Sequence, residues 1–146
     1  MSTGLRCLLT ATPSDAHTWG LVALELLLTE LGHEVTNLGP CPPEDLVVEA
    51  CRRTRPDVLV LSTTNGHGHL EAPPLIRRVR ECREQPSPWA AIGGKLDCGD
   101  GSTATAEELR AAGFDAVFPE SEGLDPFVAW IGGLGHVGRS PLVPVV

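Results

Sequence analysis

Five short runs that suit buried strands, each followed by a segment with helical spacing, constrain the fold of this chain more than any other feature. The runs cover residues 5–11, 33–39, 56–62, 89–94 and 114–120. Their length and the Val, Leu and Ile content of most of them are typical of strands covered on both faces. Strands that alternate with helices form a parallel sheet joined by right-handed crossovers. The sequence therefore predicts an α/β, flavodoxin-like (Rossmann-like) doubly wound sheet of five parallel strands in the order 2-1-3-4-5.

The segments between these runs carry helix signals. In the first, Leu21, Leu24, Leu28 and Leu31 recur at helical spacing, and Gly32 stands where a helix commonly ends. So many of its positions are apolar that we expect this helix to be buried on most sides. The other predicted helices cover residues 42–54, 71–84, 104–113 and 123–134.

The length of 146 residues fits a single domain. We assign residues 1–134 to this domain and expect residues 135–146, which are rich in Gly and Pro, to form a flexible C-terminal tail. No apolar run approaches the roughly 18 residues that span a bilayer, and residues 1–15 lack the pattern of a secretory signal. These features predict a cytoplasmic protein without a membrane partner.

Charge and cysteine content argue against nucleic-acid binding and against a cross-linked or zinc-bound scaffold. The net charge of −8 and the pI near 5.0 would repel a phosphate backbone. The arginines of residues 77–83 are interpreted as the solvated face of one helix, namely Arg77, Arg78, Arg80 and Arg83. The cysteines are odd in number with no C-x-x-C pair, so we expect reduced thiols at Cys7, Cys41, Cys51, Cys82 and Cys98.

The polar and glycine-rich stretches follow three of the predicted strands. They are "PSDAHTWG" after the first, "STTNGHGH" at the end of the third and "GGKLDCGDGS" at the end of the fourth. Ligands of open parallel sheets bind outside the carboxyl ends of the strands, where the strand order reverses. We therefore expect these three loops to line one cleft.

The pair Asp15 and His17 in the first loop has two interpretations. In the first, Ser14 or Asp15 caps the exposed amides at the start of the following helix. In the second, His17 binds a metal through one ring nitrogen, and Asp15 accepts the N–H of the other nitrogen and fixes the tautomer. One histidine cannot form a closed zinc site, which needs four ligands, but it suits a metal already held by a macrocycle.

Other kinds of site are less well supported. A protein-only metal site would combine His67 and His69 with Asp97 or Cys98, but H-x-H in a glycine-rich turn is more often simply loop. The loops lack both G-x-x-x-x-G-K-[ST] and G-x-G-x-x-G, so nucleotide fingerprints are missing. Among the three loops Cys98 is the only candidate for a cysteine nucleophile.

Three separated pieces of the sequence resemble the signature of cobalamin-binding domains. Asp15-x-His17-x-x-Gly20, Ser62-x-Thr64 and Gly93-Gly94 match D-x-H-x-x-G, S-x-L and G-G in order, spacing and strand placement. Within that family the chain is most similar to the small subunits of methylaspartate (glutamate) mutases, through "NLGPCPPEDLVVEA", "NGHGHLE" and "GGKLDCG". Thr64 departs from the pattern, which has leucine at this position.

The resemblance implies adenosylcobalamin as the cofactor. His17 would be the lower axial ligand of cobalt, in place of cobalamin's own dimethylbenzimidazole, and Asp15 would hydrogen-bond His17 and tune its basicity.

The resemblance also implies a slot for the displaced nucleotide tail. Gly20 would let the helix start pass close to the tail, and Ser62 would hydrogen-bond it. Gly93 and Gly94 would leave room for it between the sheet and the helices. The full implied cofactor-binding set is Ser14, Asp15, Ala16, His17, Thr18, Gly20, Ser62, Thr63, Thr64, Gly93, Gly94, Lys95, Leu96, Asp97, Cys98 and Gly99.

The function that the resemblance implies is that of the cobalamin-binding subunit of a carbon-skeleton mutase, most similar to those that convert glutamate to 3-methylaspartate. A separate, barrel-type large subunit would bind glutamate above the corrin, so this chain alone would hold no catalytic residue. The alternatives are a corrinoid carrier for methyl transfer, a cobalamin-dependent sensor or chaperone, and an interaction domain without cobalamin. Carriers generally have a helical cap domain before the cobalamin domain, and a first strand that starts at about Leu5 favours the mutase.

Overall fold

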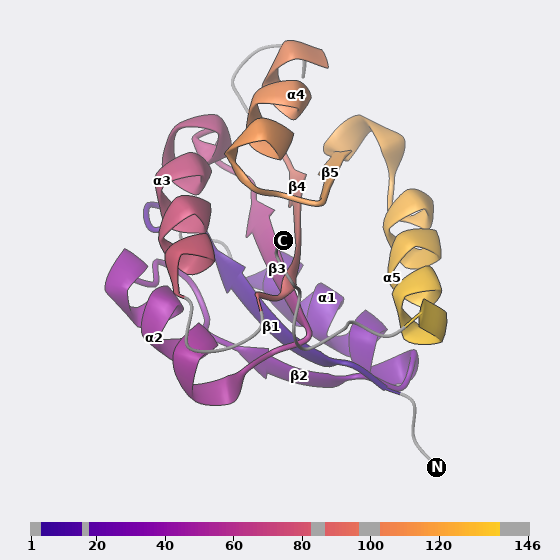
Figure 1. Ribbon diagram of the computed structural model, residues 1–146. Coiled ribbons are helices and arrows are strands. Elements are labelled where there is room, and N and C mark those ends of the chain that lie inside the picture. The colour runs from indigo at the N-terminus through magenta and orange to yellow at the C-terminus, as the bar shows by residue number, and fades with distance from the viewer. Residues whose placement is uncertain (1–3, 16–17, 83–86, 97–102, 138–146) are drawn as a thin grey trace.

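The structure is a computed structural model that describes residues 4–15, 18–82, 87–96 and 103–137. Its centre is a sheet of five parallel strands in the order β2-β1-β3-β4-β5 (Figure 1). The predicted fold class and strand order are therefore confirmed. The strands are β1 (Arg6–Ala11), β2 (Glu34–Asn37), β3 (Val58–Thr63), β4 (Trp89–Gly94) and β5 (Ala116–Pro119).

A helix follows each strand, and a short 3-10 helix stands between the last strand and the last helix. The helices are α1 (Trp19–Glu30), α2 (Glu44–Thr54), α3 (Gly68–Glu81), α4 (Thr103–Ala112), η1 (Glu120–Glu122) and α5 (Asp125–Val137). In the described part of the chain no helix is long and apolar enough to cross a membrane.

Three helix boundaries differ from the prediction by three residues, and one of them is the end of α3, at Glu81 rather than at residue 84. Helix α3 begins at Gly68 rather than at residue 71. The predicted start was too late because prolines usually mark the first turn of a helix, whereas Pro73 and Pro74 lie inside this one. Helix α5 continues past residue 134 to Val137, because a glycine lowers helix propensity by only about 1 kcal/mol and does not end a helix by itself. The division into a domain of residues 1–134 and a tail of residues 135–146 stays a prediction, and residues 138–146 lie outside the described residues.

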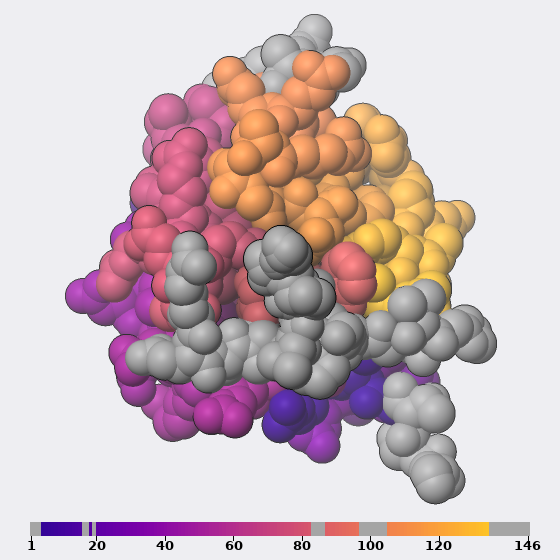
Figure 2. All heavy atoms as spheres, viewed as in Figure 1, coloured from indigo at the N-terminus to yellow at the C-terminus, as the bar shows by residue number. Residues whose placement is uncertain are grey.

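Each face of the sheet has its own apolar core. Leu59 and Leu61 of β3 point to the side covered by α2, α3 and α4, where they pack with Ile76. Val60 points to the side covered by α1 and α5 (Figure 1), where Ile131 packs. The α3 and α4 surfaces adjoin in the space-filling view (Figure 2). A two-sided core explains why most of the strand residues are apolar without alternation.

Helix α1 is less buried than its sequence predicts. Leu21 and Leu28 are fully buried, but Leu26 is 61% exposed. The expectation of burial on most sides is wrong, because one face of α1 contacts the sheet and its outer face has no described element packed against it.

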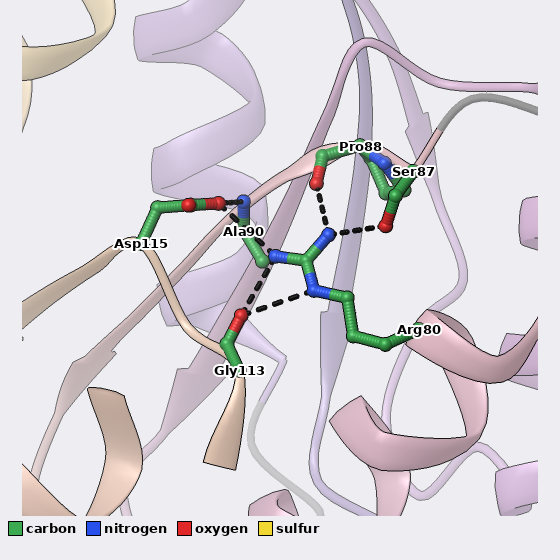
Figure 3. A network of polar contacts seen from close by, with 6 residues as sticks. All are labelled: Arg80, Ser87, Pro88, Ala90, Gly113 and Asp115. Atoms are coloured by element: carbon green, nitrogen blue, oxygen red, sulfur yellow. Dashed lines mark hydrogen bonds and ion pairs between the residues drawn. The ribbon is translucent and has the colours of Figure 1, made fainter. Parts of the chain in front are cut away.

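Arg80 joins three elements at the amino ends of β4 and β5 (Figure 3). Its guanidinium donates to the carbonyls of Gly113 and Pro88, to the Ser87 hydroxyl and to the Asp115 carboxylate, at 2.5–3.1 Å. Arg78 also forms ion pairs, with Glu44 and Asp45 of α2. The Arg78 side chain is 41% exposed, so its ion pairs lie at the surface. Among the described arginines of this cluster, the interpretation as a solvated face is therefore wrong for Arg80 alone. It holds for Arg77, which is exposed, and Arg83 lies outside the described residues.

Candidate cofactor-binding site

A cavity of about 310 Å³ opens at the carboxyl ends of β3 and β4, on the face covered by α1 and α5. This volume is at the lower end of the range of about 300–1,000 Å³ found for small-molecule sites. Four residues of the predicted set line the cavity, namely Gly20, Ser62, Gly93 and Gly94. Residues from all three predicted stretches therefore line one hollow. This hollow lies beside β3, β4 and β5 rather than between β1 and β3, where the strand order reverses.

Apolar side chains that are not in the predicted set form the remaining walls. Phe118 and Phe127 meet edge to face with their ring centroids 5.6 Å apart, and both line the cavity with Leu24 and Leu124. Leu124 is 55% exposed and stands at the rim. An apolar, aromatic wall suits a flat apolar ring. No sequence signal marks these residues, because apolar side chains of a cavity and of a core look alike.

The two glycines at the end of β4 keep the cavity floor open. A Cβ on Gly93 would lie 3.1 Å from the Phe118 carbonyl oxygen. Gly94 has a φ of +107°, and a Cβ there would lie 2.1 Å from the carbonyl oxygen of Thr63. Gly94 is therefore required by backbone geometry as well as by space.

Asp15 is buried, with an exposed fraction of 1%, and the loop after β3 holds its carboxylate. The backbone N–H of Thr64 donates to Oδ2 at 2.5 Å, and that of Asn65 donates to the same oxygen at 3.1 Å. The hydroxyl of Thr64 donates to Oδ1 at 3.0 Å. The N-cap of α1 is Thr18, so neither Ser14 nor Asp15 occupies the cap position that the first interpretation gave them.

A second set of hydrogen bonds ties the first loop to the start of α3. The Ser14 hydroxyl donates to Glu71 Oε1 at 2.9 Å, and the Asn65 side-chain amide donates to the Ser14 hydroxyl at 3.0 Å. The His67 N–H donates to Asn65 Oδ1 at 3.0 Å. Asn65 and Glu71 are missing from the predicted set, although the polar run after β3 was the signal that could have indicated them.

The loop after β4 is hydrogen-bonded to the end of β3 and to the start of α3. The Lys95 N–H donates to the Thr63 carbonyl at 2.8 Å, and the His69 N–H donates to the Leu96 carbonyl at 2.9 Å. His69 Nδ1 lies 3.1 Å from the same Leu96 oxygen, which requires the proton on Nδ1. Leu96 is buried in the core beneath α3, so its side chain lies on the sheet face opposite the cavity.

The remaining predicted residues divide into two groups. Thr63 packs against Gly68 of α3, where a Cβ would lie 2.9 Å from Thr63 Cγ2, so it lies on the face opposite the cavity. The other group lies outside the described residues and comprises Ala16, His17, Asp97, Cys98 and Gly99.

The alternative of a protein-only metal site gains no support from the described residues. Within the described ranges no group of three His, Cys, Asp or Glu side chains could hold a metal ion. Of the two histidines proposed for it, His69 contacts a carbonyl through Nδ1. The described cysteines Cys7, Cys41, Cys51 and Cys82 form no disulfide, as expected.

Comparison with known proteins identifies the family. The profile of the B12-binding domain matches residues 5–128. This chain belongs to the B12-binding domain family. It is also 29% identical over 120 residues to a protein of Treponema denticola named glutamate mutase sigma subunit, and the match covers 82% of this chain and 86% of that protein.

Solved structures of B12-binding and of other proteins share the fold. The monomethylamine corrinoid protein of Methanosarcina barkeri matches with a TM-score of 0.68 and 21% identity over 89% of this chain and 58% of that one. A Francisella response regulator receiver domain matches with a TM-score of 0.71 and 15% identity over 93% of this chain and 100% of that one. These likenesses extend to the fold alone, so the cobalamin assignment rests on the family match.

The described residues fit cobalamin as the ligand of this B12-binding domain. The cavity is apolar and aromatic, it opens at the carboxyl ends of β3 and β4, and two glycines that accept no Cβ without displacement of neighbouring atoms form its floor. Asp15 is buried, its carboxylate accepts hydrogen bonds from Thr64, and it precedes His17 by two positions in the sequence. The structure therefore provides a slot for an elongated group and a buried, hydrogen-bonded carboxylate at Asp15.

Proposed function

We propose that this B12-binding domain is the cofactor-binding subunit of a cytoplasmic, adenosylcobalamin-dependent carbon-skeleton mutase that converts glutamate to 3-methylaspartate. The observation that carries the proposal is the match over 82% of the chain to a protein named glutamate mutase sigma subunit. The partner would be a separate, barrel-type large subunit that binds the substrate. No residue of this chain is assigned a catalytic role.

The residues of this chain would bind and orient the cofactor. His17 would ligate cobalt from below, and Asp15 would hold the imidazole through its second ring nitrogen. The displaced nucleotide tail would enter the 310 Å³ cavity, with Ser62 as its polar contact and Gly93 and Gly94 beneath it. When bound, adenosylcobalamin supplies radical chemistry through homolysis of its cobalt–carbon bond, and the protein supplies binding and orientation.

The ligand assignment is tested by absorbance spectroscopy of the purified chain mixed with cobalamin. We expect wild type to bind cobalamin with its benzimidazole displaced and an imidazole on cobalt. His17→Gly is expected to lose the imidazole-coordinated spectrum, whereas His67→Gly, at an exposed histidine near Ser14, is expected to keep it. An unchanged spectrum in His17→Gly would show that His17 is not the ligand.

The reaction is tested by reconstitution. The chain is mixed with adenosylcobalamin and with the large subunit of a glutamate mutase, and 3-methylaspartate formed from glutamate is measured. Turnover is expected with both subunits and not with this chain alone. A methyl carrier would instead transfer the methyl group of methylcobalamin to an acceptor thiol when given a methyltransferase, and would fail the mutase assay while the sigma subunit of a relative passes it.

A further inference from the structure

Apolar groups form most of the cavity at the carboxyl ends of β3 and β4. Among the described residues that line it, only Ser62 and Glu120 have polar atoms in their side chains. Val60 and Ala91 contribute buried apolar side chains from the sheet. A ligand that enters the cavity therefore contacts carbon atoms on most of the described sides.

The aromatic wall of the cavity is supported by a third ring. The rings of Phe118 and Phe127, which line the cavity, meet edge to face. The Trp130 ring packs on both, with centroid distances of 5.8 Å to Phe118 and 6.4 Å to Phe127. Rings that contact one another in this way present a fixed apolar surface, which suits a flat and apolar partner.

The polar groups of the cavity can serve few ligand atoms. Ser62 is buried, and a hydroxyl donates no more than one hydrogen bond. Glu120 is exposed, and its ionised carboxylate accepts hydrogen bonds but donates none. Gly93 pairs with Ser62 of β3 and with Phe118 of β5, so the sheet uses its backbone groups. The side chains of the described walls can therefore donate to at most one ring nitrogen of a ligand.

We propose that the cavity selects among cobamides, the corrinoids with a nucleotide tail, by the polarity of the terminal base: it favours dimethylbenzimidazole and phenolic bases over purines. This selectivity rests on the proposed function, in which the displaced tail enters the cavity. Once detached from cobalt, dimethylbenzimidazole presents one free ring nitrogen, and p-cresol presents none. Both bases otherwise offer carbon atoms to the apolar walls.

Adenine differs from these bases in its polar edge, which has several free ring nitrogens and an exocyclic amine. Even with the amine donating to Glu120, ring nitrogens would lose water without gaining a donor, and a buried polar group without a partner is costly. An apolar pocket discriminates against an added polar group by about a hundredfold. We therefore expect the cobamide with adenine to bind about 10- to 100-fold more weakly than the cobamide with p-cresol.

The experiment measures dissociation constants of the full chain by absorbance titration with three corrinoids. They are the cobamide with p-cresol, the cobamide with adenine, and cobinamide, which lacks the tail. The ratio of the adenine constant to the p-cresol constant is compared between protein variants. The cost of detaching a base from cobalt belongs to the ligand alone, so it cancels in this comparison.

Two matched variants test whether the cavity wall sets the ratio. Leu124→Gln places an amide in a side chain of similar size at the rim, where the leucine is 55% exposed. Leu26→Gln is the same change at a leucine of α1 that is 61% exposed and does not line the cavity. Leu124→Gln is expected to lower the ratio about three- to tenfold, the effect of one hydrogen bond. Leu26→Gln is expected to keep the wild-type ratio, and cobinamide affinity is expected to be the same in all three proteins.

The outcomes separate this selectivity from the proposed function. Equal binding of the two cobamides by wild type, or an unchanged ratio in Leu124→Gln, would overturn the selectivity and leave the proposed function in place. Binding of the p-cresol cobamide no tighter than that of cobinamide would do the same, because the tail would then make no use of the cavity. A wild-type chain that binds none of the three corrinoids would overturn the proposed function, and the selectivity with it.

Discussion

Gly94 illustrates, at the scale of one residue, how the backbone constrains this site. Its φ of +107° belongs to the region that L residues rarely adopt, and a Cβ would lie 2.1 Å from the Thr63 carbonyl oxygen. That oxygen already accepts the Lys95 N–H at 2.8 Å, so it cannot move away without loss of a hydrogen bond. The second glycine of the G-G pair, Gly94, is therefore required by its own backbone conformation and not only by the space that the cavity needs.

Gly94→Ala is expected to lower the free energy of unfolding by about 3 kcal/mol, because strain at φ > 0 adds to a backbone clash. Urea unfolding of the purified chain measures the loss. The control is Gly132→Ala in α5, where a Cβ meets nothing within 4 Å. We expect that change to raise the free energy of unfolding by about 0.5–1 kcal/mol through helix propensity. A wild-type midpoint for Gly94→Ala would contradict the assigned geometry.

The contacts of Asp15 show what residue-scale prediction did not include. The sequence predicted Asp15 as the partner of His17, two residues away, and that pairing stays a prediction because His17 lies outside the described residues. The described partners are Thr64 and Asn65, 49 and 50 positions along the chain. Such contacts depend on which strands are neighbours and in what register, so no local pattern indicates them.

At the scale of elements, Arg80 connects α3, the start of β4 and the turn after α4 (Figure 3). It donates twice to the Gly113 carbonyl, and Asp115, its ionic partner, also accepts the Ala90 N–H at 2.8 Å. Removal of the guanidinium would leave partly buried acceptors without a donor, which costs more than the bonds themselves contribute.

Arg80→Met, which keeps an apolar stem, is expected to lower the free energy of unfolding by about 2–3 kcal/mol. Arg77→Met, at an exposed position of the same helix, is expected to change it by no more than about 0.5 kcal/mol. Chemical denaturation of the two variants side by side is the measurement. Because the Arg80 network lies at the amino ends of the strands, cobalamin affinity should be unchanged in both. Equal stability of the two variants would show that the network contributes nothing.

At the scale of the whole molecule, two apolar cores on opposite faces share one sheet. Cys7 belongs to the core beneath α1 and α5, and Cys51 to the core beneath α2, α3 and α4. Burial raises the pKa of both thiols to about 12, with a smaller contribution from Asp57 at Cys7 and from Cys82 at Cys51. Each core therefore contains a thiol that is protonated and shielded at neutral pH.

Because the thiolate is the reactive form, we expect Cys7 and Cys51 to resist alkylation in the native chain at pH 8, whereas the exposed Cys41 reacts at once. Variants that retain a single cysteine, measured by mass spectrometry in increasing urea, report each core separately. If the sheet and both helix layers form one cooperative domain, Cys7 and Cys51 become reactive over the same urea range. Separate ranges would show that the two layers unfold independently.

The sequence by itself determined the fold class, the strand order, the family and the positions of the glycines, because these follow from local periodicity and from motifs of a few residues. Only the tertiary structure decided which side chains form the cavity wall, which face of α1 is buried, and that Thr64 and Asn65 hold Asp15. Phe118 and Phe127 look like core residues until the sheet order places them around a hollow. The physical reason is that hydrogen bonds and packing between distant loops depend on the register of neighbouring strands, which no single segment encodes.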